Sequence, residues 1–198
     1  MTDFIFRYIL VLLLAAALLV FAGCASNDDD DSDDDASDDD DSEFTASSIT
    51  FEPDDAGGAG EIRLELESVD LANNRFLLKV IGDEIPLTYG VAGRLEFDVE
   101  LCALDQAQPG NALEGNGAVI IARGAGNEKG CVFGVSRSGD YTNSVQITAD
   151  KIIGTLQFTV SKAGETRIDF DKNLSLCINH DFDAVEVSDW LGGKLTVE

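Results

Sequence analysis

Hydrophobic and charged residues alternate along two stretches of this 198-residue chain. In EIRLELESV, residues 61–69, apolar side chains at 62, 64, 66 and 69 interleave with charged ones, with one slip at Ser68. In VAGRLEFDVELC, residues 91–102, charged residues stand at 94, 96, 98 and 100 between apolar ones. A period of two places one face of a β-strand on a core and the other face in water. Both stretches are therefore predicted to be half-buried strands.

Shorter apolar runs predict further strands, and turn-forming clusters separate them. No window after the first 24 residues has a convincing helical period. Eight or more short strands with frequent turns predict an all-β fold, an antiparallel β-sandwich of jelly-roll or immunoglobulin-like kind. The further strands are expected at residues 75–81, 118–122, 131–137, 144–148, 152–160, 166–170, 174–178 and 194–197.

The first 23 residues have the pattern of a secretory signal peptide. A single Arg7 precedes an uncharged run over residues 8–22, which ends in small residues before Cys24. This run is shorter than the 20 or so residues of a membrane span. The sequence FAGC resembles the lipobox of bacterial lipoproteins, with Phe21 where the motif usually has Leu. The resemblance implies cleavage before Cys24 and acylation of its thiol and new amino end. An uncleaved signal anchor with an incidental cysteine is the alternative.

Residues 24–43 join this cysteine to the rest of the chain and are dominated by aspartate. Residues 28–42 contain 11 Asp in 15 positions. Like charges at this density repel one another and leave nothing to bury, so we expect a disordered, extended linker. Weak calcium binding by the aspartates is the alternative function for this segment.

Residues 44–198 remain as a single domain of 155 residues. They contain 12 Lys and Arg against 25 Asp and Glu, an acidic balance that argues against binding to nucleic acid or to anionic lipid. The domain has three cysteines, Cys102, Cys131 and Cys177. Outside the cytoplasm one disulfide with one thiol left over is expected, and no spacing among them indicates a metal site.

Three sequence runs, in this order, resemble cohesin domains. LTYGVAGRLEFD, residues 87–98, is similar to a strand-entry motif with a Tyr-Gly turn and a Leu-x-aromatic-Asp strand. IIGTLQFTVSKAGETRIDF, residues 152–170, and the closing GGKLTVE, residues 192–198, are similar to later strands of the same family. Cohesins are not enzymes. The resemblance implies that one sheet face recognises a dockerin, a small calcium-stabilised helical module that proteins of polysaccharide degradation often carry.

The resemblance also implies where the partner would bind. The outward positions of the motif strand should be Ala92, Arg94 and Glu96, and Arg137 is expected at the rim of the neighbouring strand. The well-studied cohesins have Asn and Asp near the start of this strand, where this chain has Gly90 and Ala92. A solvated sheet face without a partner is the alternative. If the two strands pair antiparallel, the end of the first meets the start of the second, so a Cys102–Cys131 disulfide is preferred.

The sequence contains few of the residues that a catalytic site or a metal site would need. His180 is the only histidine, and a Ser-His-Asp or Cys-His site would depend on it alone. Asn179, Asp181 and Asp183 resemble the start of a calcium loop, but an EF-hand would need Gly at 184 and Glu at 190, where the chain has Ala184 and Trp190. No metal site or cofactor is therefore predicted, and a looser calcium site is left open.

The combined expectation is a non-catalytic lipoprotein of the cell envelope with one cohesin-like domain that binds a dockerin-like protein. Residues Ala25 and Ser26 after the lipid-modified cysteine favour the outer membrane by resemblance to known sorting rules. Two alternatives remain. One is a carbohydrate-binding module, for which the exposed rings would be Tyr89, Tyr141 or Trp190; the other is a structural or adhesive surface lipoprotein.

Overall fold

The alternation of residues 61–69 and of the first part of residues 91–102 appears in the structure as two strands with one buried face. The computed structural model describes residues 44–113, 118–122, 129–137 and 143–198. In β2 (Glu61–Asp70), Ile62 and Leu64 are fully buried. In β5 (Gly90–Glu96), the inward residues Val91, Gly93 and Leu95 alternate with more exposed ones. The predicted signal peptide, Cys24, the acidic linker and Tyr141 lie outside the described residues.

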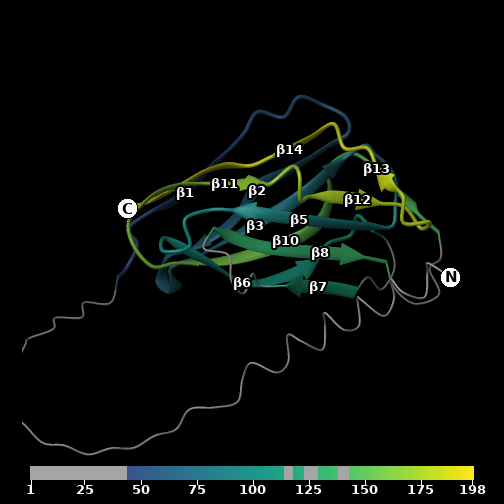
Figure 1. Ribbon diagram of the computed structural model, residues 1–198. Coiled ribbons are helices and arrows are strands. Elements are labelled where there is room, and N and C mark those ends of the chain that lie inside the picture. The colour runs from purple at the N-terminus through teal and green to yellow at the C-terminus, as the bar shows by residue number, and fades with distance from the viewer. Residues whose placement is uncertain (1–43, 114–117, 123–128, 138–142) are drawn as a thin grey trace, which may run out of the picture. The chain divides into compact units, whose positions relative to one another are not determined.

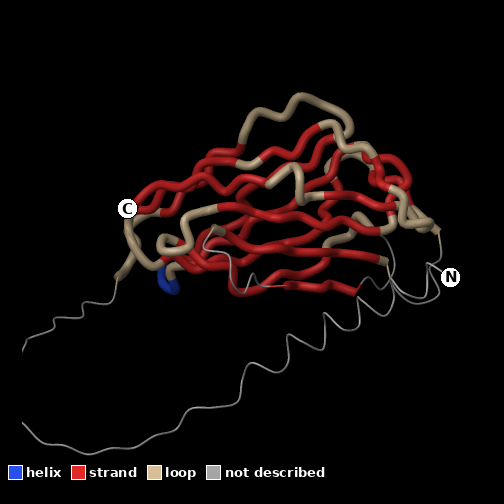
Figure 2. The backbone as a smooth tube through the Cα atoms, viewed as in Figure 1, coloured by secondary structure: helices blue, strands red, loops and turns tan. Residues whose placement is uncertain are grey.

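Two sheets face each other across the core (Figures 1 and 2). The first sheet has the order β1-β15-β11-β5-β12-β13, and β8 and β7 continue it from the free side of β5. β11 pairs with the end of β5, whereas β12 pairs with its beginning. The bounds are β1 (Ile49–Pro53), β15 (Gly193–Val197), β11 (Gly164–Phe170), β12 (Leu176–Ile178), β13 (Ala184–Val185), β8 (Gly130–Ser136) and β7 (Ala118–Ala122).

The second sheet has the order β14-β2-β3-β10-β6. Its strands are antiparallel except for the parallel pair β14–β2. A small separate sheet pairs β4 with β9, and one turn of 3-10 helix, η1, follows β2. No helix in the described part of the chain is long and apolar enough to cross a membrane. The bounds are β14 (Asp189–Leu191), β3 (Arg75–Asp83), β10 (Lys151–Val160), β6 (Cys102–Pro109), β4 (Ile85–Thr88), β9 (Val145–Ile147) and η1 (Leu71–Asn73).

Aromatic rings from both sheets fill the core. Phe76 and Phe158 of the second sheet stack with centroids 5.1 Å apart, and Phe97 meets Phe158 edge-on at 5.4 Å. On the other side, Phe170 of the first sheet packs against Trp190 at 5.1 Å. Burial of this apolar surface is the main force that holds the two layers together. The predicted all-β sandwich is confirmed, and Trp190 belongs to its core rather than to its surface.

The chain turns earlier than its alternation predicts. β5 ends at Glu96, and the backbone N–H groups of Leu101 and Cys102 both donate to the carbonyl of Asp98 at 3.1 Å. The Asp98 carboxylate also accepts from the Glu100 N–H at 2.9 Å. These bonds close a tight turn that carries the chain into β6 of the opposite sheet. The strand predicted over residues 91–102 therefore ends earlier than expected, at Glu96.

This turn bears on the predicted Cys102–Cys131 disulfide. Cys102 opens β6 in one sheet, whereas Cys131 lies in β8 of the other, so the two residues do not meet at the ends of paired strands. They line the same small cavity of about 120 Å³ between the sheets. All three cysteines, with Cys177, are buried and free in the structure. The predicted bridge is absent from it.

Candidate binding face

The outward residues of β5 form the centre of an open sheet face. Ala92 and Arg94 are half-buried and Glu96 is exposed, whereas Val91, Gly93 and Leu95 point to the core. The predicted outward orientation of Ala92, Arg94 and Glu96 is therefore confirmed. Their role as partner contacts stays a prediction.

One half of this face consists of small and apolar residues in two rows across the strands. Leu176 of β12, Ala92 of β5 and Gly134 of β8 lie opposite one another. Ile178, Gly90 and Ser136 form the next row. Directly opposite residues of antiparallel strands share a face, so these six positions belong to one surface. No charged residue stands in either row.

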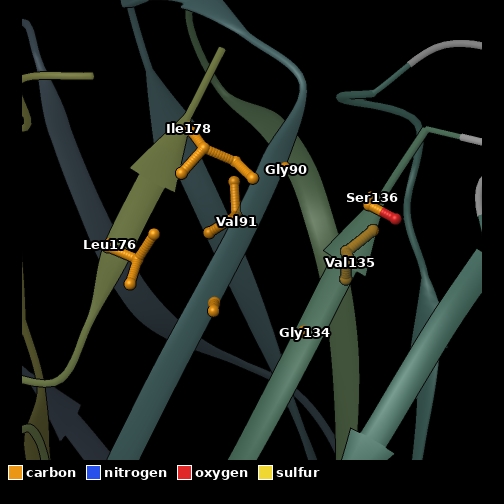
Figure 3. A pocket seen from close by; sticks show the side chains of 8 residues that line it. Gly90, Val91, Gly134, Val135, Ser136, Leu176 and Ile178 are labelled. Atoms are coloured by element: carbon orange, nitrogen blue, oxygen red, sulfur yellow. The ribbon is translucent and has the colours of Figure 1, made fainter. Parts of the chain in front are cut away.

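A shallow groove of about 150 Å³ runs along these rows (Figure 3). Leu176 and Ile178 form one wall, and the missing side chains of Gly90 and Gly134 leave the floor low. A Cβ atom at Gly90 would lie 3.3 Å from Ile178 Cγ1 and 3.4 Å from Ser136 Cβ, within the groove. The side chain of Leu176 is 45% exposed. The groove thus presents apolar surface to solvent at the middle of the sheet, and it can accept a side chain from outside.

The other half of the face is charged. Arg94 Nε lies 3.9 Å from both the Glu96 and the Asp171 carboxylates, and Asp169 of β11 stands opposite Glu96 in the register. The backbone N–H of Arg94 donates to Ser175 Oγ at 3.1 Å, which fixes the connection from β11 to β12 against β5. Asp169 is itself paired with Arg167, whose Nη2 lies 2.8 Å from Asp169 Oδ1. Three carboxylates and two guanidinium groups leave this half slightly acidic, which favours a basic surface on a partner.

Arg137 does not lie at the rim, contrary to the prediction. It follows β8 on the inward side of the alternation and is only 8% exposed. Its Nη1 donates to the Asn143 carbonyl at 2.9 Å, and its backbone N–H donates to the Tyr89 carbonyl at 3.0 Å. Arg137 therefore ties loops together at this end of the sandwich, and Ser136 is the outward residue of the strand end.

Sequence reasoning missed β12 as a wall of the site. Residues 174–178 were predicted to be a strand, but nothing in the sequence indicated its pairing with β5. The signal present was the alternation of Leu174 and Leu176 with Ser175 and Cys177, in which only Cys177 and Ser175 are buried. That pattern indicates exposed leucines, which are a feature of interaction surfaces.

Asn179, Asp181 and Asp183, whose spacing resembles the start of a calcium loop, lie in a turn that is closed by hydrogen bonds to the Asn179 side chain. Asn179 Oδ1 accepts the backbone N–H groups of Asp181 and Asp183, both at 2.9 Å. No group of three or more His, Cys, Asp or Glu able to hold a metal ion occurs among the described residues. His180 is exposed, with its Nδ1 3.3 Å from Ser144 Oγ and its Nε2 3.2 Å from an Asp181 carboxylate oxygen.

Comparisons with known proteins agree with the sandwich. No protein-family model matches the sequence, and no curated protein matches it. Among solved structures, a type II cohesin domain from the cellulosome of Acetivibrio cellulolyticus is similar over 69% of this chain and 93% of its own, with a TM-score of 0.52 and 14% identity. The seventh ScaB type I cohesin from Pseudobacteroides cellulosolvens is similar over 70% of this chain and 91% of its own (TM-score 0.51, 12% identity). CaCohA2 from Clostridium acetobutylicum is similar over 77% and 92% (TM-score 0.50, 12% identity). The domain therefore has a cohesin-like fold, as its sequence motifs predict.

Proposed function

We propose that this chain is a lipid-anchored binding protein whose sandwich recognises a dockerin-like protein through the face of β12, β5 and β8. The observation that carries the proposal is the groove beside Leu176, which leaves apolar surface exposed at the centre of an open sheet. Protein-binding surfaces combine an apolar centre with a polar surround. Here the charged half, with Arg94 and Glu96, supplies polar groups on one side of the groove.

The fold supports a binding role without catalysis. CaCohA2, which is similar to this domain, is solved in a complex with CaDoc0917. By analogy, the partner would be a module of the same kind, carried by a protein of polysaccharide degradation. A flat face with small residues at Gly90, Ala92 and Gly134 suits this role, because a partner backbone can approach it closely.

The anchor completes the proposal. An acylated Cys24 and an aspartate-rich linker would hold the domain away from the outer membrane, with the binding face free to meet its partner. Several acyl chains anchor a protein stably, whereas one chain holds it only marginally. This part of the proposal rests on residues 1–43 of the sequence.

A direct screen tests the proposed function. Dockerin modules encoded in the same genome are purified in the presence of calcium and passed over the immobilised full chain, with a second run in a calcium chelator. Retention of at least one module that depends on calcium is the expected result. If every module flows through while the chain remains folded by circular dichroism, the dockerin-like partner is excluded.

A further inference from the structure

Two glycines stand inside strands on the open face of the first sheet. Gly90 of β5 and Gly134 of β8 both line the groove, and Ala92 lies opposite Gly134 in the register. A glycine inside a strand is destabilising relative to alanine, because it loses more backbone entropy on folding and packs no side chain. Strand glycines are therefore found where a turn, a close packing contact or the approach of another group requires them.

Neither the core nor the backbone requires the glycine at position 90. At Gly93, the core is the reason, since a Cβ atom there would lie 2.4 Å from Phe133 Cε1. A Cβ atom at Gly90 would instead meet Ile178 and Ser136, which line the groove on the outer face. The φ of Gly90 is not in the left-handed region, so an alanine could adopt the same backbone conformation. The groove is the feature that remains to explain this glycine.

The groove is narrow at Gly90. A single carbon atom at this position would lie 3.3 Å from Ile178 Cγ1 and 3.4 Å from Ser136 Cβ, in contact with both walls. Figure 3 shows β12 on one side, β8 on the other, and β5 as the floor between them. The whole groove measures about 150 Å³, and an apolar space of about 150 Å³ can hold one benzene molecule. It therefore has room for one side chain of about the size of leucine.

The lining selects an apolar occupant. Leu176 and Ile178 form one wall, and Ser136 is the one polar side chain among the described residues that line the groove. A charged group or a sugar ring would lose its hydrogen bonds to water here and find a single hydroxyl in return. An apolar side chain would instead cover the surface of Leu176, which is 45% exposed.

We propose that the groove takes one leucine-sized apolar side chain of the protein partner and that Gly90 limits the size of this side chain. The inference rests on the proposed function and names the chemical group that the face recognises. The inserted side chain packs against Leu176 and Ile178 on one side and Ser136 Cβ on the other, directly over Gly90. Gly90 is then a residue that determines specificity, because any side chain at this position occupies the space that the partner needs.

A double-mutant cycle between the chain and its partner tests this inference. The exposed apolar residues of a dockerin module retained in the screen are replaced by alanine one at a time, and each variant is titrated into the full chain. One replacement should weaken binding at least about tenfold, because it removes the inserted side chain. Gly90→Ala should weaken binding of the unaltered module about tenfold. The truncated module should bind Gly90→Ala and the unaltered chain within about threefold of each other, since the two losses share one cause.

Ala103→Val is the control, because it adds carbon atoms at an exposed position of β6 in the opposite sheet. It should bind the unaltered module with unchanged affinity, and urea denaturation should show that Gly90→Ala remains folded. The inference is overturned if the module binds Gly90→Ala as well as the unaltered chain, or if the losses from Gly90→Ala and from every module variant simply add. A chain that binds no module at all excludes the proposed function itself, and this inference with it.

Discussion

Leu176 lies directly opposite Ala92 in the register between β12 and β5, and both residues stand on the open face of the first sheet. Their contact is possible because β11 leaves β5 after Phe170, so that β12 takes the place beside its first residues. This short strand adds an apolar wall to a face that Ala92, Gly90 and Gly134 would otherwise leave flat.

Replacing Leu176 by aspartate should therefore weaken partner binding with little effect on folding. Leu176 is 45% exposed, so we expect a change in unfolding free energy below about 1 kcal/mol. The loss of an apolar anchor at the centre of the face should weaken binding about tenfold. Biolayer interferometry with a retained dockerin module measures the change. Leu174→Asp introduces the same charge two residues away, outside the groove, and should bind normally; equal losses for both variants would contradict the assignment of the groove.

Gly93 should tolerate no side chain. A Cβ atom there would lie 2.4 Å from Phe133 Cε1 and 3.1 Å from a ring carbon of Phe170. Both rings sit in the packed core, so Gly93→Ala should lower the unfolding free energy by about 1 to 3 kcal/mol. Urea denaturation followed by Trp190 fluorescence measures the loss. Gly90→Ala, on the outward side of the same strand, is the control and should change stability by much less. Equal effects would mean that ring contact is not what requires the glycine at position 93.

The buried thiols should make stability depend on pH in the alkaline range. Burial raises the pKa of Cys102, Cys131 and Cys177 to about 12 in the folded chain. In the unfolded chain the thiols ionise near pH 8.5. The unfolded state therefore releases protons first, and stability that is fully present below pH 8.5 should fall as the pH rises toward 12.

Two measurements check this expectation. Urea midpoints recorded from pH 7 to 10.5 should decline above about pH 8.5, and the decline should be smaller in Cys177→Ala. A thiol reagent at pH 8 should label the folded chain slowly and the urea-unfolded chain at once, because thiolate is the reactive form. Rapid labelling of the folded chain would show that the thiols are not held in the core.

The lipid anchor makes a separate prediction. Cys24→Ser should leave the mature chain in the soluble fraction, whereas the unaltered chain should partition into detergent, since its proposed acyl chains are its attachment to the membrane. Phase partition with a detergent, followed by immunoblotting, measures this. Ser26→Ala, two residues further on, should remain membrane-bound. A Cys24→Ser chain that stays in the membrane fraction would instead support the uncleaved signal anchor.

Much of the fold could be predicted because the alternation of apolar and polar residues along a strand shows which of its faces is buried. The outward positions of β5 followed from alternation alone, and the sandwich followed from the number and spacing of the strands. The turn at Asp98 could not be predicted in this way, because Phe97 before it and Leu101 after it are both buried and the apolar pattern of the sequence continues through the change of sheet. The same limit explains the error at Cys102. The error at Arg137 has another cause, because its inward position continues the alternation of Cys131, Phe133 and Val135.

The candidate site was predicted only in part for a related reason. Alternation shows which face of a strand is exposed, but not which strands lie beside it. Leu176 and Ile178 are more than 80 residues from Gly90 and Ala92 in the chain, and only the long-range pairing of β12 with β5 brings them together.

Isothermal titration calorimetry of a purified, calcium-loaded dockerin module into the full chain and two variants tests most directly whether the face of β12, β5 and β8 binds the partner. Ala92→Arg places a long charged side chain in the middle of the binding face, and Gln157→Arg adds the same charge on the opposite sheet. We expect the unaltered chain and Gln157→Arg to bind with equal affinity, whereas Ala92→Arg should bind at least about tenfold more weakly. Unchanged affinity for Ala92→Arg, or an equal loss for both variants, would contradict it.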